Sequence, residues 1–268
     1  MSPVISFLLY SAVAVWIFMT AVFILALLIK DNSIVDIAWG GGYVAITLLT
    51  FFLEPGAVAR HWLISALVIL WGIRLMIHIS LRKRGAAEDF RYAKWRREWG
   101  RWLVPRSYLQ IYMLQGVFML LIASPVIHTN ASSTRGLGWL DFLGLSFWLI
   151  GFFFEAVGDA QLARFKKDPS NKGKIMTEGL WRLTRHPNYF GEVTMWWGIF
   201  LIALSVPGGW LTIISPLLIT FLLLRVSGVT MLEKKYRGNL EFETYARKTS
   251  AFFPLPPKKD ESTPNEGR

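Results

Sequence analysis

The sequence predicts an all-α fold: a bundle of about seven transmembrane helices, with the N-terminus outside and the C-terminus in the cytoplasm. Three observations favour this fold. Of the 268 residues, 53% are hydrophobic and the mean hydropathy is +0.40, which is too apolar for an ordinary soluble domain. Apolar runs of about 20 residues, the length that a bilayer requires, recur along the chain. Basic residues gather in alternate segments between these runs.

The apolar runs follow one another with short connections. The first run has no basic segment before it and is long enough to span, so we interpret it as a retained helix and not as a signal peptide. Together the runs predict one membrane domain over residues 1–254, with its motifs concentrated in 155–256, and a disordered tail over 255–268. The expected spans are 4–29, 33–53, 62–81, 108–127, 139–160, 187–206 and 210–226.

The connecting segments give the expected orientation, because cytoplasmic loops carry an excess of lysine and arginine. The basic segments are 82–106, 161–186 and the tail from Lys234 onward. The segments 54–60, 128–138 and 207–209 hold only Arg60 and Arg135 between them. This distribution accounts for the net charge of +11 without nucleic acid as a partner. We expect a multi-pass protein of a bacterial inner membrane that contacts membrane lipids; its oligomeric state is not predicted.

The basic segment 82–106 carries tryptophans at helical spacing. Trp95, Trp99 and Trp102 recur beside Arg96 and Arg97, which predicts an amphipathic helix in the membrane interface. Such a helix can serve as a simple anchor or as a lid over a ligand.

The sequence contains no cysteine, which excludes disulfides, thiolate nucleophiles, thiolate zinc sites and cysteine-ligated iron–sulfur clusters. No metal site is predicted.

Ionisable residues inside the apolar runs lie mostly in their cytoplasmic halves, where they predict a polar cavity that opens to the cytoplasm. Asp36 is distinctive because it precedes the run Gly40-Gly41-Gly42, where another backbone or a ligand can approach closely. A packing seam with a paired aspartate is the alternative. The residues concerned are Asp36, Arg74, His78, Glu155, Asp159, Glu192 and Arg225, with Glu233 just beyond the last span.

The stretch LWRLTRHPNYFGE, residues 180–192, stands where the sixth span begins. Proline is tolerated at the first position of a helix, so Pro187 is expected to start this helix with His186 just outside it. Free N–H groups of the first turn, with Arg185 and His186, then form an anion site that suits a phosphate-bearing ligand. A phospholipid anchor is the alternative interpretation.

Several motifs resemble the steroid 5α-reductase superfamily, in particular its bacterial branch of largely uncharacterised membrane proteins. They are GLWRLTRHPNYFGE, RVSGVTMLEKKY and YARKTSAFFPLPP in the C-terminal part, with NSIVDIAWG and RGAAEDFRY nearer the N-terminus. The resemblance implies a seven-helix reductase that uses NADPH to reduce a carbon–carbon double bond conjugated to a carbonyl. It also implies a hydrophobic lipid or steroid-like substrate in an intramembrane pocket.

The resemblance implies roles for particular residues. The cofactor contacts carried over where the motifs match are Asp159, Asn188, Tyr189, Glu192 and Arg225. Charge and position add Lys166, Arg185 and His186 as candidates for the phosphates. The superfamily's glutamine on the second helix and tyrosine on the third are absent, so Asp36 takes the catalytic acid role with Tyr43 or His78 in support.

Membrane methyltransferases of the isoprenylcysteine and phospholipid type share part of this pattern. They carry an RHPxYxG turn and a following segment with glutamate, and they bind S-adenosylmethionine. Those enzymes commonly have two adjacent glutamates in this segment, whereas EKKY in this sequence has one. They also have no obvious counterpart of NSIVDIAWG. A lipid-binding scaffold with a vestigial site is the third class, although a scaffold gains nothing from a buried Asp36.

Overall fold

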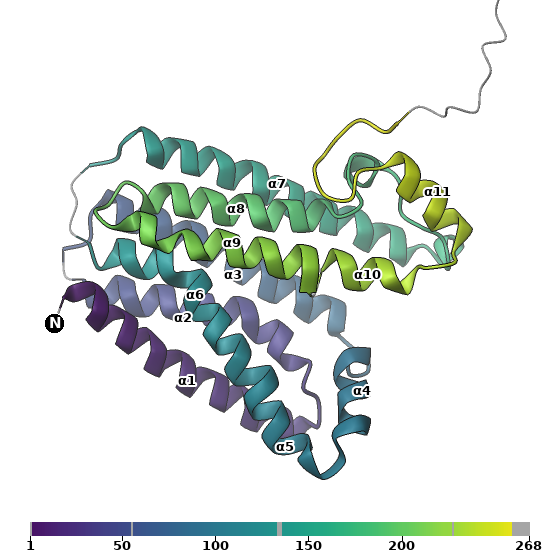
Figure 1. Cartoon of the computed structure of the whole chain (residues 1–268), viewed down its shortest axis with the longest axis horizontal. Helices are drawn as coiled ribbons and strands as arrows, with labels where there is room; N and C mark the ends of the chain where they lie inside the picture. The colour runs from purple at the N-terminus through teal and green to yellow at the C-terminus, as the bar shows by residue number, and fades with distance from the viewer. Residues whose placement is uncertain (1, 55, 133–135, 227, 259–268) are drawn as a thin grey trace, which may run out of the picture. The chain divides into compact units, whose positions relative to one another are not determined.

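A computed structural model describes residues 2–54, 56–132, 136–226 and 228–258 and confirms the all-helical fold over these ranges (Figure 1). The chain divides into two compact units, which are described separately. The first comprises Met1–Gly144 with Ile199–Leu218, and the second comprises Leu145–Gly198 with Ile219–Arg268.

Four long helices build the first unit: α1 packs on α2 and α6, and α2 packs on α3 and α6. Their bounds are Pro3–Ile29 for α1, Ile34–Leu53 for α2, Ala59–Lys83 for α3 and Leu114–Asn130 for α6. Short elements connect α3 to α6, namely α4 (Phe90–Trp99), a 3-10 turn (Gly100–Trp102), α5 (Leu103–Arg106) and a π-helical segment (Ser107–Met113). The predicted interfacial helix in 82–106 therefore corresponds to α4 and α5.

The second unit holds most of α7 (Trp139–Lys167) and of α8 (Pro187–Ala203). The 3-10 turns Pro169–Asn171 and Gly179–Arg182 lie in the connection between them. A further 3-10 turn, Gly209–Ile213, belongs to the first unit, and α9 (Ile214–Phe221) passes from the first unit into the second. The chain continues through a π-helical segment (Leu222–Val226), α10 (Val229–Lys235) and α11 (Leu240–Lys248).

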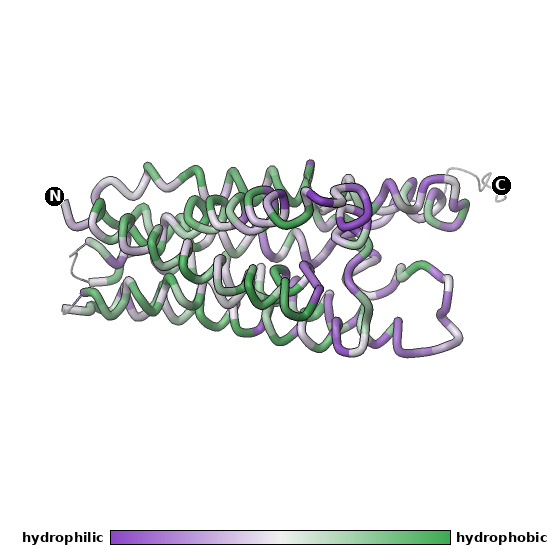
Figure 2. The backbone as a smooth tube through the Cα atoms, turned by 90° about the horizontal axis from the view of Figure 1, so that it is seen from below, coloured by the Kyte–Doolittle hydropathy of each residue, from purple (hydrophilic) through white to green (hydrophobic). Residues whose placement is uncertain are grey.

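Six helical segments of the described chain are long and apolar enough to cross a membrane. They are Pro3–Ile29, Ile34–Leu53, Ala59–Lys83, Phe90–Asn130, Trp139–Lys167 and Gly209–Lys234. Figure 2 shows hydrophobic residues along the long helices and more hydrophilic residues near their connections.

The expected sixth span, 187–206, is the shorter helix α8, which is not among these six. It has 17 residues and ends at Ala203, with a turn that leads to Pro207 and Gly208. The amides of Ser205 and Val206 bond the carbonyls three residues back, at Ile202 and Ala203, so tight turns close the helix before Pro207. At 1.5 Å per residue α8 is roughly 25 Å long, at the lower limit for a hydrocarbon core of about 30 Å.

Arg60, which precedes the third expected span, forms a buried ion pair with Asp141 in the first unit. Arg60 Nε lies 2.8 Å from Asp141 Oδ1, and both side chains are almost fully buried, with 5% and 0% exposed. Arg60 also donates to the Gly136 carbonyl, while Asp141 accepts from the Gly138 amide. These bonds satisfy charges that would be costly to bury unpaired.

Of the predicted tail, residues 255–258 lie within the described range, and the Leu255 amide donates to the Leu183 carbonyl at 3.0 Å. Residues 259–268 and Arg135, which entered the orientation argument, lie outside the described residues.

Candidate functional site

Asp36 stands in the first turn of α2, where its carboxylate binds two side chains of α4. Arg91 Nη2 lies 2.8 Å from Asp36 Oδ2, and the Tyr92 hydroxyl donates to Asp36 Oδ1 at 2.7 Å. Tyr92 is 3% exposed. The motifs NSIVDIAWG and RGAAEDFRY therefore form one cluster, in which a phenol hydroxyl, a guanidinium and a carboxylate meet.

Two further carboxylates before α4 fix its start. Asp89 caps the helix by accepting from the Arg91 amide at 3.0 Å, and it also contacts Arg91 Nε at 2.8 Å. Glu88 accepts from the Asn32 amide at 2.8 Å and from Arg96 at 2.9 Å. These contacts tie the beginning of α4 to the connection between α1 and α2, so Arg91 and Tyr92 are held at Asp36.

The connections around the cluster carry carboxylates with lowered pKa values. Burial alone would raise the pKa of Asp31, but hydrogen bonds from Lys83 and Ser33 lower it below its ordinary value. Burial alone would also raise the pKa of Asp89. Hydrogen bonds from the side chain and the backbone amide of Arg91 outweigh this effect, so the pKa of Asp89 is lowered. Both groups favour the folded arrangement in their ionised form.

A close crossing of α2 and α3 follows one turn after Asp36. A methyl group on Gly40 would lie 2.4 Å from the Gly72 carbonyl oxygen, and one on Gly72 would lie 2.7 Å from the Gly40 carbonyl oxygen. Only hydrogen fits at either position, which confirms the expected close backbone approach at the glycine run. The crossing fixes α2, and with it the position of Asp36.

The two residues expected to support Asp36 lie elsewhere on these helices. Tyr43 is two turns further along α2, roughly 10 Å from Asp36 along the helix axis. It is fully buried, and its ring centre lies 5.3 Å from that of Trp39 and 5.2 Å from that of Trp71. His78 is half-buried on α3, four residues after Arg74. Their catalytic roles stay predictions.

In the second unit, glycines bring α7 and α8 into close contact. A methyl group on Gly191 would lie 2.4 Å from the Gly151 carbonyl oxygen, and one on Gly158 would lie 3.1 Å from Pro187. The same crossing brings Asn188 to Asp159, with Asn188 Nδ2 3.2 Å from Asp159 Oδ1. Two of the predicted cofactor residues therefore meet.

The remaining oxygen of the Asn188 amide is buried, and no donor of the described residues reaches it. Exchanging its amide oxygen and nitrogen would place two oxygens together at Asp159, so the assignment with Nδ2 toward Asp159 is the favourable one. A buried acceptor without a donor is costly. It suits a ligand that carries an N–H group, such as the carboxamide of a nicotinamide.

Arg185 and His186 stand just before α8, and Pro187 starts this helix as predicted. Arg185 binds both oxygens of Glu233 at 2.8 and 3.0 Å and donates to the carbonyls of Ala246 and Thr249 at 2.9 and 2.7 Å. His186 Nε2 lies 3.1 Å from Glu233 Oε1. The guanidinium of Arg185, expected at a phosphate, therefore joins the turn to α10 and α11.

The C-terminal segment is held to the same turn by further hydrogen bonds. The Tyr245 hydroxyl donates to the Trp181 carbonyl, and Trp181 Nε1 donates to the Gly158 carbonyl at 3.0 Å. Burial raises the pKa of Tyr245 above its ordinary value. The Arg185 amide also donates to the Ser250 carbonyl at 2.9 Å. This chain of contacts reaches α7 next to Asp159.

The other predicted cofactor residues surround this turn. Tyr189 stacks on His186 with ring centroids 5.4 Å apart and planes 8° apart, and Glu192 is half-buried one turn further along α8. Lys166 near the end of α7 and Arg225 before α10 are exposed. No described distance places these four side chains around one ligand, so their cofactor roles stay predictions.

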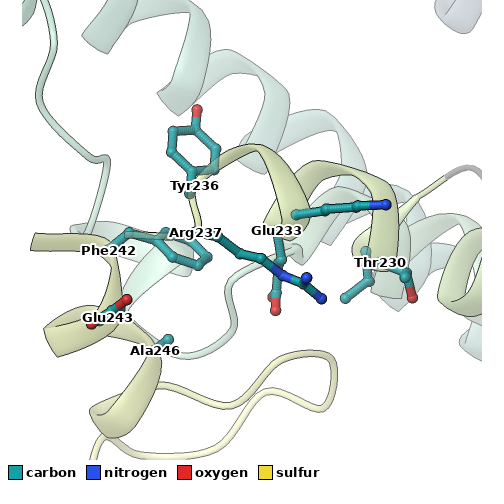
Figure 3. A pocket seen from close by; sticks show the side chains of 9 residues that line it. Thr230, Glu233, Tyr236, Arg237, Phe242, Glu243 and Ala246 are labelled. Atoms are coloured by element: carbon teal, nitrogen blue, oxygen red, sulfur yellow. The ribbon is translucent and has the colours of Figure 1, made fainter. Parts of the chain in front are cut away.

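An open pocket of about 340 Å³ lies between α10 and α11 (Figure 3). Glu233 lines it, so the carboxylate that binds Arg185 and His186 also borders this space. Tyr236 and Phe242 stack at 5.0 Å on one side. The lining residues are Val229, Thr230, Glu233, Lys234, Tyr236, Arg237, Phe242, Glu243 and Ala246.

Sequence reasoning missed three side chains of these two clusters. Arg91 and Tyr92 lie in the motif RGAAEDFRY. The only signal for them in the sequence was an arginine followed by a tyrosine in this motif. Glu233 was noted only as a charge beyond the last span. Its partners Arg185 and His186 lie 48 and 47 residues away, and nothing in the local pattern indicates that pairing.

Two relatives are similar to parts of the chain. An uncharacterized protein of Schizosaccharomyces pombe, C594.04c, is 29% identical over 198 residues, which cover 64% of this chain and 57% of that protein. The protein named probable O-methyltransferase ustE, from Ustilaginoidea virens, is 43% identical over 53 residues, which cover 20% of this chain and 18% of that protein. The chain thus matches less than two thirds of either relative's length. No solved structure matches.

The family comparison covers most of the chain. The profile described as "Protein of unknown function (DUF1295)" matches residues 22–249, a range that includes both clusters. The chain therefore belongs to the DUF1295 family.

Proposed function

We propose that this protein is a membrane reductase that uses NADPH to reduce a carbon–carbon double bond conjugated to a carbonyl in a hydrophobic, lipid or steroid-like substrate. The observation that carries the proposal is the Tyr92 hydroxyl 2.7 Å from Asp36, whose other oxygen binds Arg91. A positioned acid next to an intramembrane carboxylate is what carbonyl polarisation requires, and ionisable groups in a span are usually functional.

Tyr92 is the group that we assign to the substrate. Its single O–H, which donates to Asp36 Oδ1 in the structure, turns to the substrate carbonyl oxygen when the substrate binds, which draws electrons from the double bond and makes the β carbon the hydride acceptor. Asp36 is a positioning residue that orients the phenol, and Arg91 fixes Asp36. The substrate gains one hydride from NADPH, which leaves as NADP⁺, at the β carbon and one proton from water at the α carbon, so the reaction balances.

The second unit is assigned to the cofactor. The buried Oδ1 of Asn188 would accept from the carboxamide N–H of a bound nicotinamide, and Asp159 holds the Asn188 amide in that orientation. Because Arg185 already binds Glu233 and two carbonyls, we assign the phosphates to exposed cations, Lys166 and Arg225 among them.

Methyl transfer from S-adenosylmethionine is the second candidate, favoured by the 53-residue similarity to a probable O-methyltransferase. The ammonium group of that cofactor would also suit Asn188 and Asp159, so the second unit does not discriminate between the two reactions. The cluster of Asp36, Arg91 and Tyr92 is the reason we favour the reductase, because a phenol hydrogen bond to a carbonyl assists hydride addition.

Turnover tests the proposal. The purified protein in nanodiscs is incubated with NADPH and a panel of membrane-soluble enones, and products are identified by mass spectrometry. We expect loss of NADPH matched by a product with two added hydrogens. A methylated product formed from S-adenosylmethionine, with no consumption of NADPH, would overturn it.

A further inference from the structure

Helix α4 has two faces of different character. Tyr92, Trp95, Arg96 and Trp99 recur at the spacing of one helical face and are buried or half-buried. Tyr92 donates to Asp36, Arg96 binds Glu88 at 2.9 Å and the Lys30 carbonyl at 3.0 Å, and Trp95 stacks on Trp99 at 5.5 Å. This face attaches α4 to the rest of the first unit and to the candidate site.

The opposite face and the residues that follow are exposed and mix cations with large apolar side chains. Phe90, Trp102 and Leu109 are 59%, 54% and 60% exposed. Arg101 lies over the Trp102 ring at 5.7 Å, an arrangement of cation and aromatic ring. The exposed cations over this stretch are Lys94, Arg97, Arg101 and Arg106.

Most of this positive charge is not balanced within the protein. Lys94 pairs with Glu98 at 3.6 Å, whereas no carboxylate of the described residues forms an ion pair with Arg97, Arg101 or Arg106. The chain turns after α4, at Gly100, and then runs through α5 and the π-helical segment into α6, so these residues lie next to an apolar helix long enough to cross a membrane (Figure 1). Arginines and exposed aromatic rings at the end of a span match the interface of an anionic bilayer.

We propose that the outer face of α4 and α5 binds the headgroups of anionic phospholipids, and that this contact holds Arg91 and Tyr92 on Asp36. The arginines provide the charge, and Phe90, Trp102 and Leu109 enter the boundary between headgroups and acyl chains. Phe90 and Arg97 stand on α4 itself and the other outer residues follow it directly, so an anchor on this outer face restrains the inner face of α4. The inference does not depend on which reaction the protein catalyses.

Hydrogen exchange of peptides from 90–106 tests the inference without an activity assay. The full-length protein is compared in nanodiscs of phosphatidylcholine alone and of phosphatidylcholine with phosphatidylglycerol. We expect slower exchange in the anionic discs. The double substitution R97Q/R101Q should remove most of this protection, by about fivefold for each arginine (~1 kcal/mol).

The matched control is K172Q/K174Q, which removes the same charge from an exposed segment of the second unit. It should keep the lipid-dependent protection, and both variants should exchange like the unmodified protein in neutral discs. Added salt should weaken the effect of the anionic lipid. Equal exchange of 90–106 in both lipids, or protection retained in R97Q/R101Q, would overturn the inference.

Discussion

Tyr92 and Asp36 form the contact on which the proposed chemistry depends. The substitution Tyr92→Phe removes the hydroxyl and leaves the ring against Trp95. Because a positioned proton donor contributes 10²-fold or more, we expect turnover to fall by about 100-fold or more, with cofactor binding retained. Steady-state NADPH oxidation measures turnover, and the rise in melting temperature with added NADPH measures cofactor binding.

The control for that change is Tyr108→Phe. The Tyr108 hydroxyl contacts Trp16 and Thr20 at 3.1 and 3.2 Å, away from Asp36's partners. We expect near-normal turnover from it. If Tyr92→Phe turns over as fast as this control, the phenol has no part in the chemistry.

Asn188 tests the cofactor half of the proposal. Asn188→Leu keeps the approximate size of the side chain but removes the buried acceptor, and one lost hydrogen bond in such a site weakens NADPH binding by about tenfold (~1.4 kcal/mol). Affinity is measured by titration of the purified protein. Asn171→Leu, in a surface turn where Asn171 bonds the Phe165 carbonyl, is the control. Equal affinities in the two variants would remove Asn188 from the cofactor site.

At the scale of elements, the crossing of α2 and α3 depends on Gly40 but not on its neighbour. A methyl group on Gly40 would lie 2.4 Å from a backbone oxygen, whereas the nearest atom to one on Gly41 lies at 3.6 Å. We therefore expect Gly40→Ala to destabilise the protein by about 1–3 kcal/mol through overpacking, and Gly41→Ala to be tolerated. Thermal unfolding in detergent compares the two. Similar melting temperatures would show that this crossing is looser than the structure indicates.

The connections that hold α4 are sensitive to acid. Asp31 and Asp89 have lowered pKa values, so their contribution is present above the ordinary carboxyl pKa near 4 and is lost as the pH falls through the lower folded values. The melting temperature should therefore decline below about pH 4, and D31N/D89N should flatten that decline. Glu98→Gln, which changes an exposed pair with Lys94, is the control. An unchanged decline in D31N/D89N would assign the acid sensitivity to other groups.

Sequence pattern predicted the elements better than their pairings. Hydropathy located the long helices, and proline chemistry placed the start of α8 at Pro187. The end of α8 at Ala203 was not foreseen, because the apolar composition continues to Val206 while the backbone already turns toward Pro207. Helical spacing also predicted that Trp95 and Trp99 share a face of α4, whereas Trp102 lies beyond this helix in an exposed 3-10 turn.

Local sequence pattern could not predict which residues pair within the candidate site. Asp36 was identified from its cost in a membrane span, but its contact with Tyr92 joins residues 56 positions apart. Likewise the Arg185 guanidinium was expected at a phosphate, since nothing near it in sequence shows that Glu233 and two carbonyls occupy its donors. Such pairings depend on packing between distant segments.

At the scale of the whole molecule, the proposed acid cluster belongs to the first unit and the proposed cofactor cluster to the second. The description of the DUF1295 family names no activity. The identity of the cofactor therefore decides which of the two reactions the protein catalyses. The cluster of Asp159 and Asn188 accommodates either a nicotinamide or the ammonium of S-adenosylmethionine. Only the ligand itself separates a reductase from a methyltransferase.

Thermal stability of the purified protein, titrated separately with NADPH, NADH and S-adenosylmethionine, tests this claim most directly. A ligand that binds the folded protein stabilises it by mass action, by about 2.7 kcal/mol at 100 times its Kd. We predict a saturable rise in melting temperature with NADPH, a smaller rise with NADH and none with S-adenosylmethionine. Stabilisation by S-adenosylmethionine alone would contradict the account.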